Sequence, residues 1–249
     1  MRLFKNSTAD LTTVQNLVID IDDTIWIQPG ADEDEEREYQ AFAALQGLSP
    51  EQLRGQISRK KAELKRRHGR KFSMYEILLK LGISPNQLTQ IRCSIYQPER
   101  WIKQPDAKLC EALAELSQVF RIAFGTNSPV PVGERVVELL GLRKLFPPAA
   151  YPVWGFENLG FFKPNPEFFT GIASLMSWSP NCGLSIGDSD HKDGQAALDA
   201  GFTAAIIVEN GPADLCDLIP LLVGKDWKTI SSLCVLEDTL DPAWPLNRG

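Results

Sequence analysis

Three aspartates follow an apolar run near the start of the chain. The run, 17–22, is typical of a buried parallel strand. It brings three carboxylates and a hydroxyl to the carboxyl end of that strand: Asp20, Asp22, Asp23 and Thr24. In an open α/β sheet, ligands bind at this end of a central strand, and unneutralised carboxylates there favour a divalent cation or a cationic partner. The alternative is a solvated acidic turn, because paired carboxylates are common in loops.

A second apolar run, 182–188, also ends in a carboxylate. Asp188 closes this run, and Asp193 follows five residues later. Oxygen ligands from two strand ends suit an octahedral Mg²⁺ site, with water and a substrate phosphate completing the coordination. The sequence therefore predicts a magnesium site shared with the first acidic segment. The alternative is that Asp193 caps a helix or shapes a turn.

Two further segments carry groups that suit a phosphate. Lys163 lies between aromatic residues and a proline-containing turn, which restricts where its ammonium points. Thr126 and Asn127 close another apolar run before Pro129, so a hydroxyl and backbone N–H groups face the same sheet edge and form a suitable phosphate cradle. A solvated loop lysine and an ordinary helix cap are the alternative interpretations.

Apolar runs alternate with helical patterns over most of the chain. Strands are predicted over 17–22, 120–126, 182–188 and 203–208. Helices are predicted over 107–118, 132–140, 166–176 and 194–200, with Pro and Gly at the breaks. Strands that alternate with helices of this length predict an α/β fold with a doubly wound parallel sheet.

One stretch, 27–104, breaks this alternation. Its helical patterns cover 32–45, 50–67, 74–81 and 85–101, with no convincing strand between them. We therefore expect two domains, an α/β core of residues 1–26 and 105–249 and an all-helical insertion of residues 27–104. The insertion holds 14 basic and 10 acidic residues, against 12 and 22 in the rest of the chain. Its basic run, 59–71, is interpreted as a solvated helix face rather than a substrate contact.

Composition excludes several classes of protein. With 43% hydrophobic and 23% charged residues, the 249-residue chain is neither disordered nor fibrous. Its formal net charge of −6 argues against nucleic acid as a stable partner and against an anionic membrane surface. The five cysteines form no C-x-x-C pair, so neither a disulfide framework nor a zinc site is indicated. Because the N-terminus lacks an apolar signal segment, we expect a cytoplasmic protein.

In this order, the four chemical segments resemble the motifs of the haloacid dehalogenase superfamily, specifically its phosphatase branch. The first motif, Asp-x-Asp-x-Thr after an apolar strand, is similar to Asp20–Thr24. The second, a strand-end Ser or Thr, is similar to Thr126. The third resembles Lys163–Phe168, and the fourth resembles Gly187–Asp193.

The resemblance covers residues 15–27 and about 105–210. It extends to 196–201, which fits the family's Gly-Ala-x-x-Ala-Gly except that alanine replaces the first glycine. It implies a Rossmann-like core. The helical insertion follows the first motif, which is where the family has a helical cap, and a cap would close over the site and exclude bulk water.

The resemblance also implies a reaction. Asp20 would attack the phosphorus of a phosphomonoester and form an aspartyl-phosphate that water then hydrolyses. Asp22 would be the general acid for the leaving alcohol and then the base for that water. An Asp20 carboxylate oxygen, the Asp22 backbone carbonyl and Asp188 would hold Mg²⁺, which offsets the repulsion between phosphate and carboxylates.

Supporting roles follow from the same resemblance. Lys163 would place a positive charge beside Asp20, while Thr126 and Asn127 would bind the substrate phosphate together with Lys163. Asp193 would position Lys163 or the metal-bound waters. Thr24 would support the first motif.

Within the superfamily, Asp22 favours hydrolysis of a small phosphorylated metabolite. Dehalogenases of this fold lack the second carboxylate, because a halide leaving group needs no proton. A phosphomutase would use the same residues but return the phosphoryl group to a sugar phosphate, and spacing does not separate it from a hydrolase. A non-catalytic regulatory protein with a phosphorylatable aspartate is a further alternative, which the retention of all four motifs disfavours. The physiological substrate and the oligomeric state stay open.

Overall fold

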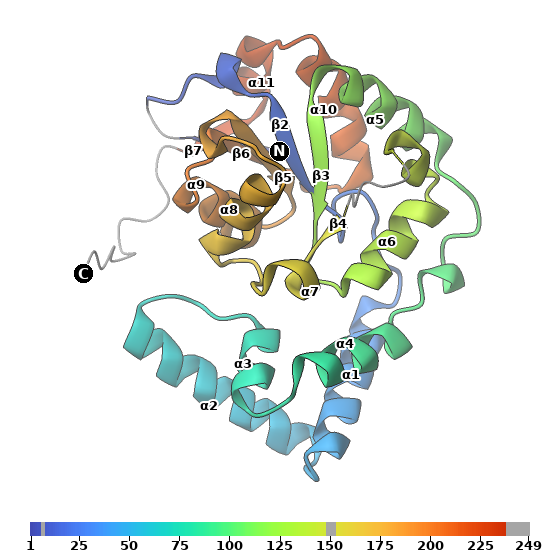
Figure 1. The fold of residues 1–249 in the computed structure, drawn as a ribbon, viewed down its shortest axis with the longest axis vertical. Helices are drawn as coiled ribbons and strands as arrows, with labels where there is room; N and C mark the ends of the chain where they lie inside the picture. Colours follow the sequence, from blue (N-terminus) through green and yellow to red (C-terminus); the bar gives the residue numbers. More distant parts are fainter. Residues whose placement is uncertain (6–7, 148–152, 238–249) are drawn as a thin grey trace. The chain divides into compact units, whose positions relative to one another are not determined.

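The computed structural model describes residues 1–5, 8–147 and 153–237. They form two compact units (Figure 1). The core unit contains Met1–Gln28 and the described residues from Pro98 onward, and the helical unit is Pro29–Gln97. The helical unit lies within the predicted insertion, 27–104.

A seven-stranded sheet forms the centre of the core unit, in the order β4-β3-β2-β5-β6-β1-β7. The strands are β1 (Arg2–Lys5), β2 (Asn16–Asp20), β3 (Arg121–Gly125), β4 (Val153–Trp154), β5 (Gly183–Gly187), β6 (Ala204–Ile207) and β7 (Val235–Glu237). Neighbouring strands run parallel except β1, which is antiparallel to β6. The predicted α/β fold is therefore confirmed, with one antiparallel pair added toward the edge of the sheet.

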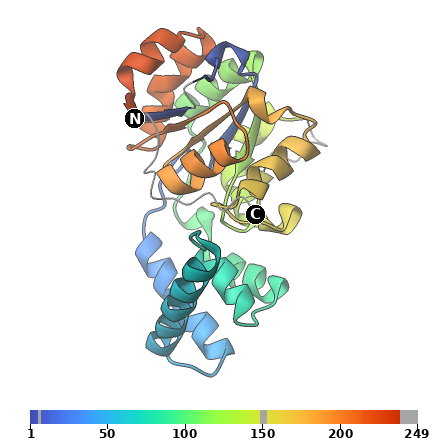
Figure 2. The same ribbon diagram turned by 90° about the vertical axis from the view of Figure 1, so that its left-hand side faces the viewer.

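The central strands are apolar on both faces because helices cover both sides of the sheet (Figure 2). Leu17 and Ile19 of β2 pack with residues of α5 (Ala107–Val119) and α10 (Pro212–Val223). Val18 points to the opposite face and packs with residues of α8 (Pro166–Leu175) and α9 (Ala196–Asp199). This alternation follows from the two-residue period of a strand. It fixes the register that brings Asp20 to the end of β2.

The remaining helices of the core unit are α6 (Val130–Leu139), α7 (Phe156–Leu159) and α11 (Trp227–Leu233). The helix predicted over 194–200 is confirmed only as α9. A π-helical turn, Asp190–Gln195, comes directly before it. This turn starts three residues after the end of β5, so its carboxylates stay near the carboxyl edge of the sheet.

The helical unit contains α1 (Ala31–Leu45), α2 (Pro50–His68), α3 (Met74–Lys80) and α4 (Pro85–Ile95). Serines at 49, 73 and 84 cap the last three of these helices with reciprocal capping boxes. In its interior, Arg92 Nε lies 2.7 Å from Glu38 Oε1, and both side chains are almost fully buried. This ion pair links α1 to α4. The basic residues 65–68 at the end of α2 are exposed, as the solvated-face interpretation predicts.

The structure departs from the prediction in the helix after Pro85 and in elements that were not predicted. The helix predicted over 85–101 ends at Ile95, because Pro98 disfavours a helical conformation at the residue before it. Strands β1 and β7 and helices α10 and α11 were not predicted. The tail 241–249, expected to be a loose surface strap, lies outside the described residues. No helix among the described residues is long and apolar enough to cross a membrane.

Candidate active site

The chain turns sharply after β2 and separates the first two aspartates. The carbonyl oxygen of Ile21 accepts the backbone N–H groups of three of the next five residues, at 3.1 to 3.3 Å. Asp23 takes a left-handed φ of 58°, a conformation that Asp adopts more readily than most residues. Asp20 therefore stays at the buried end of the strand, 6% exposed, while Asp22 is half-buried on the turn.

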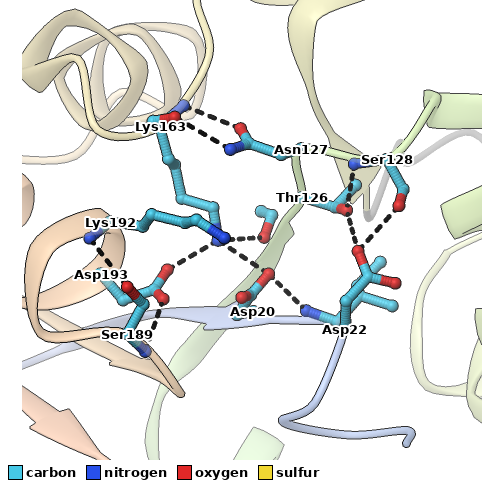
Figure 3. Close-up of polar contacts among 11 residues, drawn as sticks. Asp20, Asp22, Thr126, Asn127, Ser128, Lys163, Ser189, Lys192 and Asp193 are labelled. Carbon is cyan, nitrogen blue, oxygen red and sulfur yellow. Dashed lines mark hydrogen bonds and ion pairs between the residues drawn. The ribbon is translucent and has the colours of Figure 1, made fainter. Parts of the chain in front are cut away.

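Lys163 joins two carboxylates at the carboxyl edge of the sheet (Figure 3). Its Nζ lies 2.7 Å from Asp20 Oδ1 and 2.6 Å from Asp193 Oδ1, and it donates to the Gly125 carbonyl oxygen at 3.3 Å. Lys163 and Asp193 are 2% and 1% exposed. A buried ammonium with three acceptors is held in one position, and it fixes both carboxylates with it.

Asp188 joins this pair of carboxylates at the end of β5. One oxygen from each of Asp20, Asp188 and Asp193 can be chosen so that all three atoms lie within 4.8 Å of one another. Gly187 makes the approach of Asp193 possible, because a Cβ at this position would lie 2.3 Å from Asp193 Cγ. Hard oxygen donors at this spacing are suited to a divalent cation.

The electrostatics of the site show an excess of negative charge. Burial raises the pKa of Asp20 well above its ordinary value, and Asp193 and Asp22 raise it further, against the opposing effect of Lys163. Burial and then Asp193 likewise raise the pKa of Asp188. Burial alone would lower the pKa of Lys163, but Asp193 and Asp20 outweigh it and hold that pKa above its usual value. Lys163 is therefore a cation, and one cation does not balance these carboxylates.

Asp22 has different partners. Thr126 Oγ1 donates to Asp22 Oδ2 at 2.9 Å, and Ser128 Oγ donates to the same oxygen at 2.8 Å. Both hydroxyls come from the loop between β3 and α6, so the ends of β2 and β3 meet at this carboxylate. The arrangement separates two kinds of carboxylate: Asp20 is paired with a buried ammonium, and Asp22 is held by neutral hydroxyls.

A cavity of about 480 Å³ opens next to Asp188 within the core unit. It is lined by Asp23, Ile27, Asp188, Val208, Glu209 and Gly211. Its volume falls in the range of small-molecule sites.

The model of one family, described as haloacid dehalogenase-like hydrolase, matches residues 14–201, more than half of the chain. The chain belongs to the haloacid dehalogenase-like hydrolase family. The matched segment contains every residue that the sequence placed in the site. No curated protein matches the chain.

Solved structures similar to this family member include proteins named for different reactions. A haloacid dehalogenase-like hydrolase from Xanthomonas campestris is 17% identical, with a TM-score of 0.49, over 92% of this chain and 99% of that chain. A phosphatase of the superfamily from Thermococcus onnurineus is 20% identical, with a TM-score of 0.45, over 79% and 86%. A 2-haloacid dehalogenase from Pseudomonas syringae pv. Tomato is 20% identical, with a TM-score of 0.48, over 86% and 99%.

The structure of this haloacid dehalogenase-like hydrolase places the predicted site residues in three groups. The carboxylates of Asp20, Asp188 and Asp193 lie together with Lys163. Asp22, predicted to offer a backbone carbonyl to the metal, turns its side chain away from them toward Thr126. That carbonyl's role stays a prediction.

Asn127 and Thr24 form the third group. The Asn127 amide donates to the Lys163 carbonyl oxygen at 2.9 Å and accepts the Lys163 N–H at 2.8 Å, so it fixes the backbone that carries the lysine. Thr24 is fully buried, and no hydrogen-bond partner of its hydroxyl lies among the described residues. The predicted site residues did not include Ser128, which contacts Asp22. The sequence Thr-Asn-Ser, with a second hydroxyl at the end of β3, was the signal that could have indicated it.

Proposed function

We propose that this protein is a Mg²⁺-dependent hydrolase of small phosphomonoesters that forms an aspartyl-phosphate on Asp20. The observation that supports it most is that the two carboxylate oxygens of Asp20 differ in their hydrogen-bond partners. Oδ1 accepts the Lys163 ammonium at 2.7 Å and the Ile21 N–H at 2.8 Å. Among the described residues no donor reaches Oδ2. One oxygen is therefore fixed, and the other is left to react.

The residues present fit a magnesium ion. Three carboxylates offer hard oxygens at close spacing, and burial disfavours the charged forms of Asp20 and Asp188 unless a further cation is present. Asp20 and Asp188 would hold the ion, with Asp193 close enough to order its water. When bound, the ion would supply positive charge that screens the carboxylates from the substrate phosphate.

In the first step, Asp20 Oδ2 forms a bond to phosphorus and the bond from phosphorus to the ester oxygen breaks. The leaving oxygen keeps the electron pair and takes a proton from Asp22. In the second step, water attacks the aspartyl-phosphate and gives a proton to Asp22 while the bond from phosphorus to Asp20 breaks. The sum is an ester and water giving an alcohol and phosphate, with both aspartates restored.

Asp22 favours this reaction over halide displacement. A halide leaves without a proton, so a dehalogenase has no use for a second carboxylate two residues after the nucleophile. Two hydroxyls hold Asp22 in place, and a fixed position is what a general acid or base needs. A mutase uses the same groups but transfers the phosphoryl group back to a sugar phosphate instead of to water.

The helical unit is the proposed cap of this enzyme, in keeping with its place after the first motif. The buried Glu38 and Arg92 ion pair links two of its helices, and capping boxes begin α2, α3 and α4. It would select the leaving group and exclude water during the first step.

Phosphate release from 4-nitrophenyl phosphate with Mg²⁺ tests the proposal. We expect turnover that Asp20→Asn or EDTA abolishes and that Asp217→Asn, an exposed control, leaves unchanged. Release of halide from a 2-haloacid in place of phosphate would assign the protein to the dehalogenases. Transfer of the phosphoryl group between positions of a sugar, without release, would assign it to the mutases.

A further inference from the structure

The two oxygens of Asp22 are not equivalent in this structure. Oδ2 accepts two hydroxyl hydrogen bonds, from Thr126 and Ser128, at 2.9 and 2.8 Å (Figure 3). Within the described part of the chain, no donor reaches Oδ1. An oxygen that already accepts two hydrogen bonds is a poorer site for a proton than one that accepts none. A proton on this carboxyl group therefore belongs on Oδ1.

The Thr126 hydroxyl cannot donate a hydrogen bond to Asp22 and to a phosphate at the same time. Its hydroxyl donates to Asp22 and accepts the backbone N–H of Ser128 at 2.8 Å. A hydroxyl has a single proton to donate. Once Thr126 donates to a phosphate oxygen, as proposed above, it must release Asp22.

Ser128 makes the same contact from two residues further along the chain. Its hydroxyl makes no other hydrogen bond among the described residues, and its backbone N–H stays bonded to Thr126. The carboxylate therefore keeps one donor on Oδ2 when Thr126 turns to the phosphate. Without Ser128, Asp22 would rotate freely at the moment its proton is needed.

We propose that Ser128 is a positioning residue that holds Oδ2 of Asp22, so that Asp22 exchanges its proton through Oδ1 while Thr126 binds phosphate. This inference rests on the proposed phosphatase function. In the first step the O–H bond at Oδ1 breaks and its proton goes to the leaving oxygen. In the second step the attacking water returns a proton to the same atom. Ser128 itself gains and loses no proton.

Two substrates that differ in their leaving group distinguish a positioning role of Ser128 from a merely structural one. An alkyl phosphate needs a proton as its P–O bond breaks, whereas 4-nitrophenolate leaves readily without one. We expect Ser128→Ala to lower kcat/KM, which reports the steps up to formation of the aspartyl-phosphate, by about 10- to 100-fold on an alkyl phosphate and by less than about 3-fold on 4-nitrophenyl phosphate. Ser128→Thr keeps a hydroxyl and should recover most of the alkyl activity.

Ser117→Ala is the matched control, because Ser117 is also a partly buried serine of the core unit and bonds only to the Ala114 carbonyl oxygen. It should change neither rate. If Ser128→Ala lowers both rates equally, or neither, the positioning role is overturned while the phosphatase function stands. If the wild-type protein hydrolyses neither ester, the proposed function is wrong and the role of Ser128 is overturned with it.

Discussion

The Lys163 ammonium lies 2.7 Å from an Asp20 oxygen, and both side chains are almost fully buried. Lys163 also bonds to Asp193 from the adjacent loop. This one side chain therefore connects the end of β2 to the turn that follows β5. Its removal would leave two buried carboxylates without a counter-ion.

Replacing Lys163 with methionine keeps the length of the side chain and removes its charge. We expect Lys163→Met to lower kcat by at least about 100-fold and the free energy of unfolding by about 3–5 kcal/mol, because an unpaired buried charge is strongly destabilising. Phosphate release and urea denaturation measure the two effects. Lys108→Met, at an exposed position, should change neither. A stable, active Lys163→Met variant would contradict the assigned role.

Magnesium should stabilise the folded chain as well as support turnover. A ligand that binds the native state alone raises the melting temperature, and the stabilisation grows with the logarithm of its free concentration above the dissociation constant. We expect millimolar Mg²⁺ to raise the Tm of the wild-type protein and to have a much smaller effect on Asp188→Asn. Differential scanning fluorimetry over a Mg²⁺ titration checks this. Equal shifts in both proteins would place the ion elsewhere.

The same glycine-to-alanine substitution should have opposite effects at two positions. At Gly187 the new Cβ would lie 2.3 Å from Asp193 Cγ, so Gly187→Ala should destabilise the core unit by about 1–3 kcal/mol and reduce turnover. At Gly55, inside α2, the nearest atom is the end of the Arg59 side chain at 3.5 Å. Gly55→Ala should stabilise its helix by about 1 kcal/mol. Thermal unfolding of both variants distinguishes the cases.

Glu38 makes the stability of the helical unit depend on pH. Burial raises the pKa of Glu38 in the folded state, although Arg92 opposes the shift. The folded state therefore binds the proton more tightly than the unfolded state, and this contribution to stability is complete below the ordinary value of 4.5 and is lost as the pH rises through the folded value. Amide hydrogen exchange of peptides from residues 29–97 should slow as the pH falls from 7 toward 5, after correction for the intrinsic rate.

Removing Arg92 should make the stability of the helical unit depend more strongly on pH. In Arg92→Met the buried Glu38 carboxylate has lost its counter-ion, so we expect a loss of about 3–5 kcal/mol at pH 7 that acid partly restores. The double variant Glu38→Gln with Arg92→Met should show much less change with pH. A pH dependence that persists in the double variant would have to come from another group.

The strand ends and their carboxylates were accessible to sequence reasoning because each depends on a local pattern. An apolar run followed by Asp20 or Asp188 can be recognised from about eight consecutive residues. Asp193 was harder to place, since its approach to Lys163 requires the π-helical turn and the absence of a side chain at Gly187. The contact between Asp22 and Ser128 joins positions 106 residues apart. No local pattern encodes it.

The strand β1 and the helix α10 were not predicted from the sequence, and each was missed for a physical reason. The four residues of β1 are too few to show a strand period, and the strand is recognisable only through its pairing with β6. Helix α10 contains Pro220, which sequence reasoning takes as a helix breaker. Its apolar face, formed by residues on both sides of Pro220, packs in the core with residues of α5 and the sheet, so tertiary contacts outweigh the local preference.

The position of β1 between β6 and β7 sets the order in which the sheet can be completed. Arg2 pairs with Ile207 on one side and with Val235 on the other, so β1 is synthesised long before either of its neighbours in the sheet. Until then its backbone groups are available to other chains. A nascent or truncated chain that stops before residue 204 retains β2, β3 and β5 but leaves its N-terminal strand without a partner in this sheet. Faithful synthesis of the C-terminal third is therefore a condition for protecting the N-terminus from aggregation.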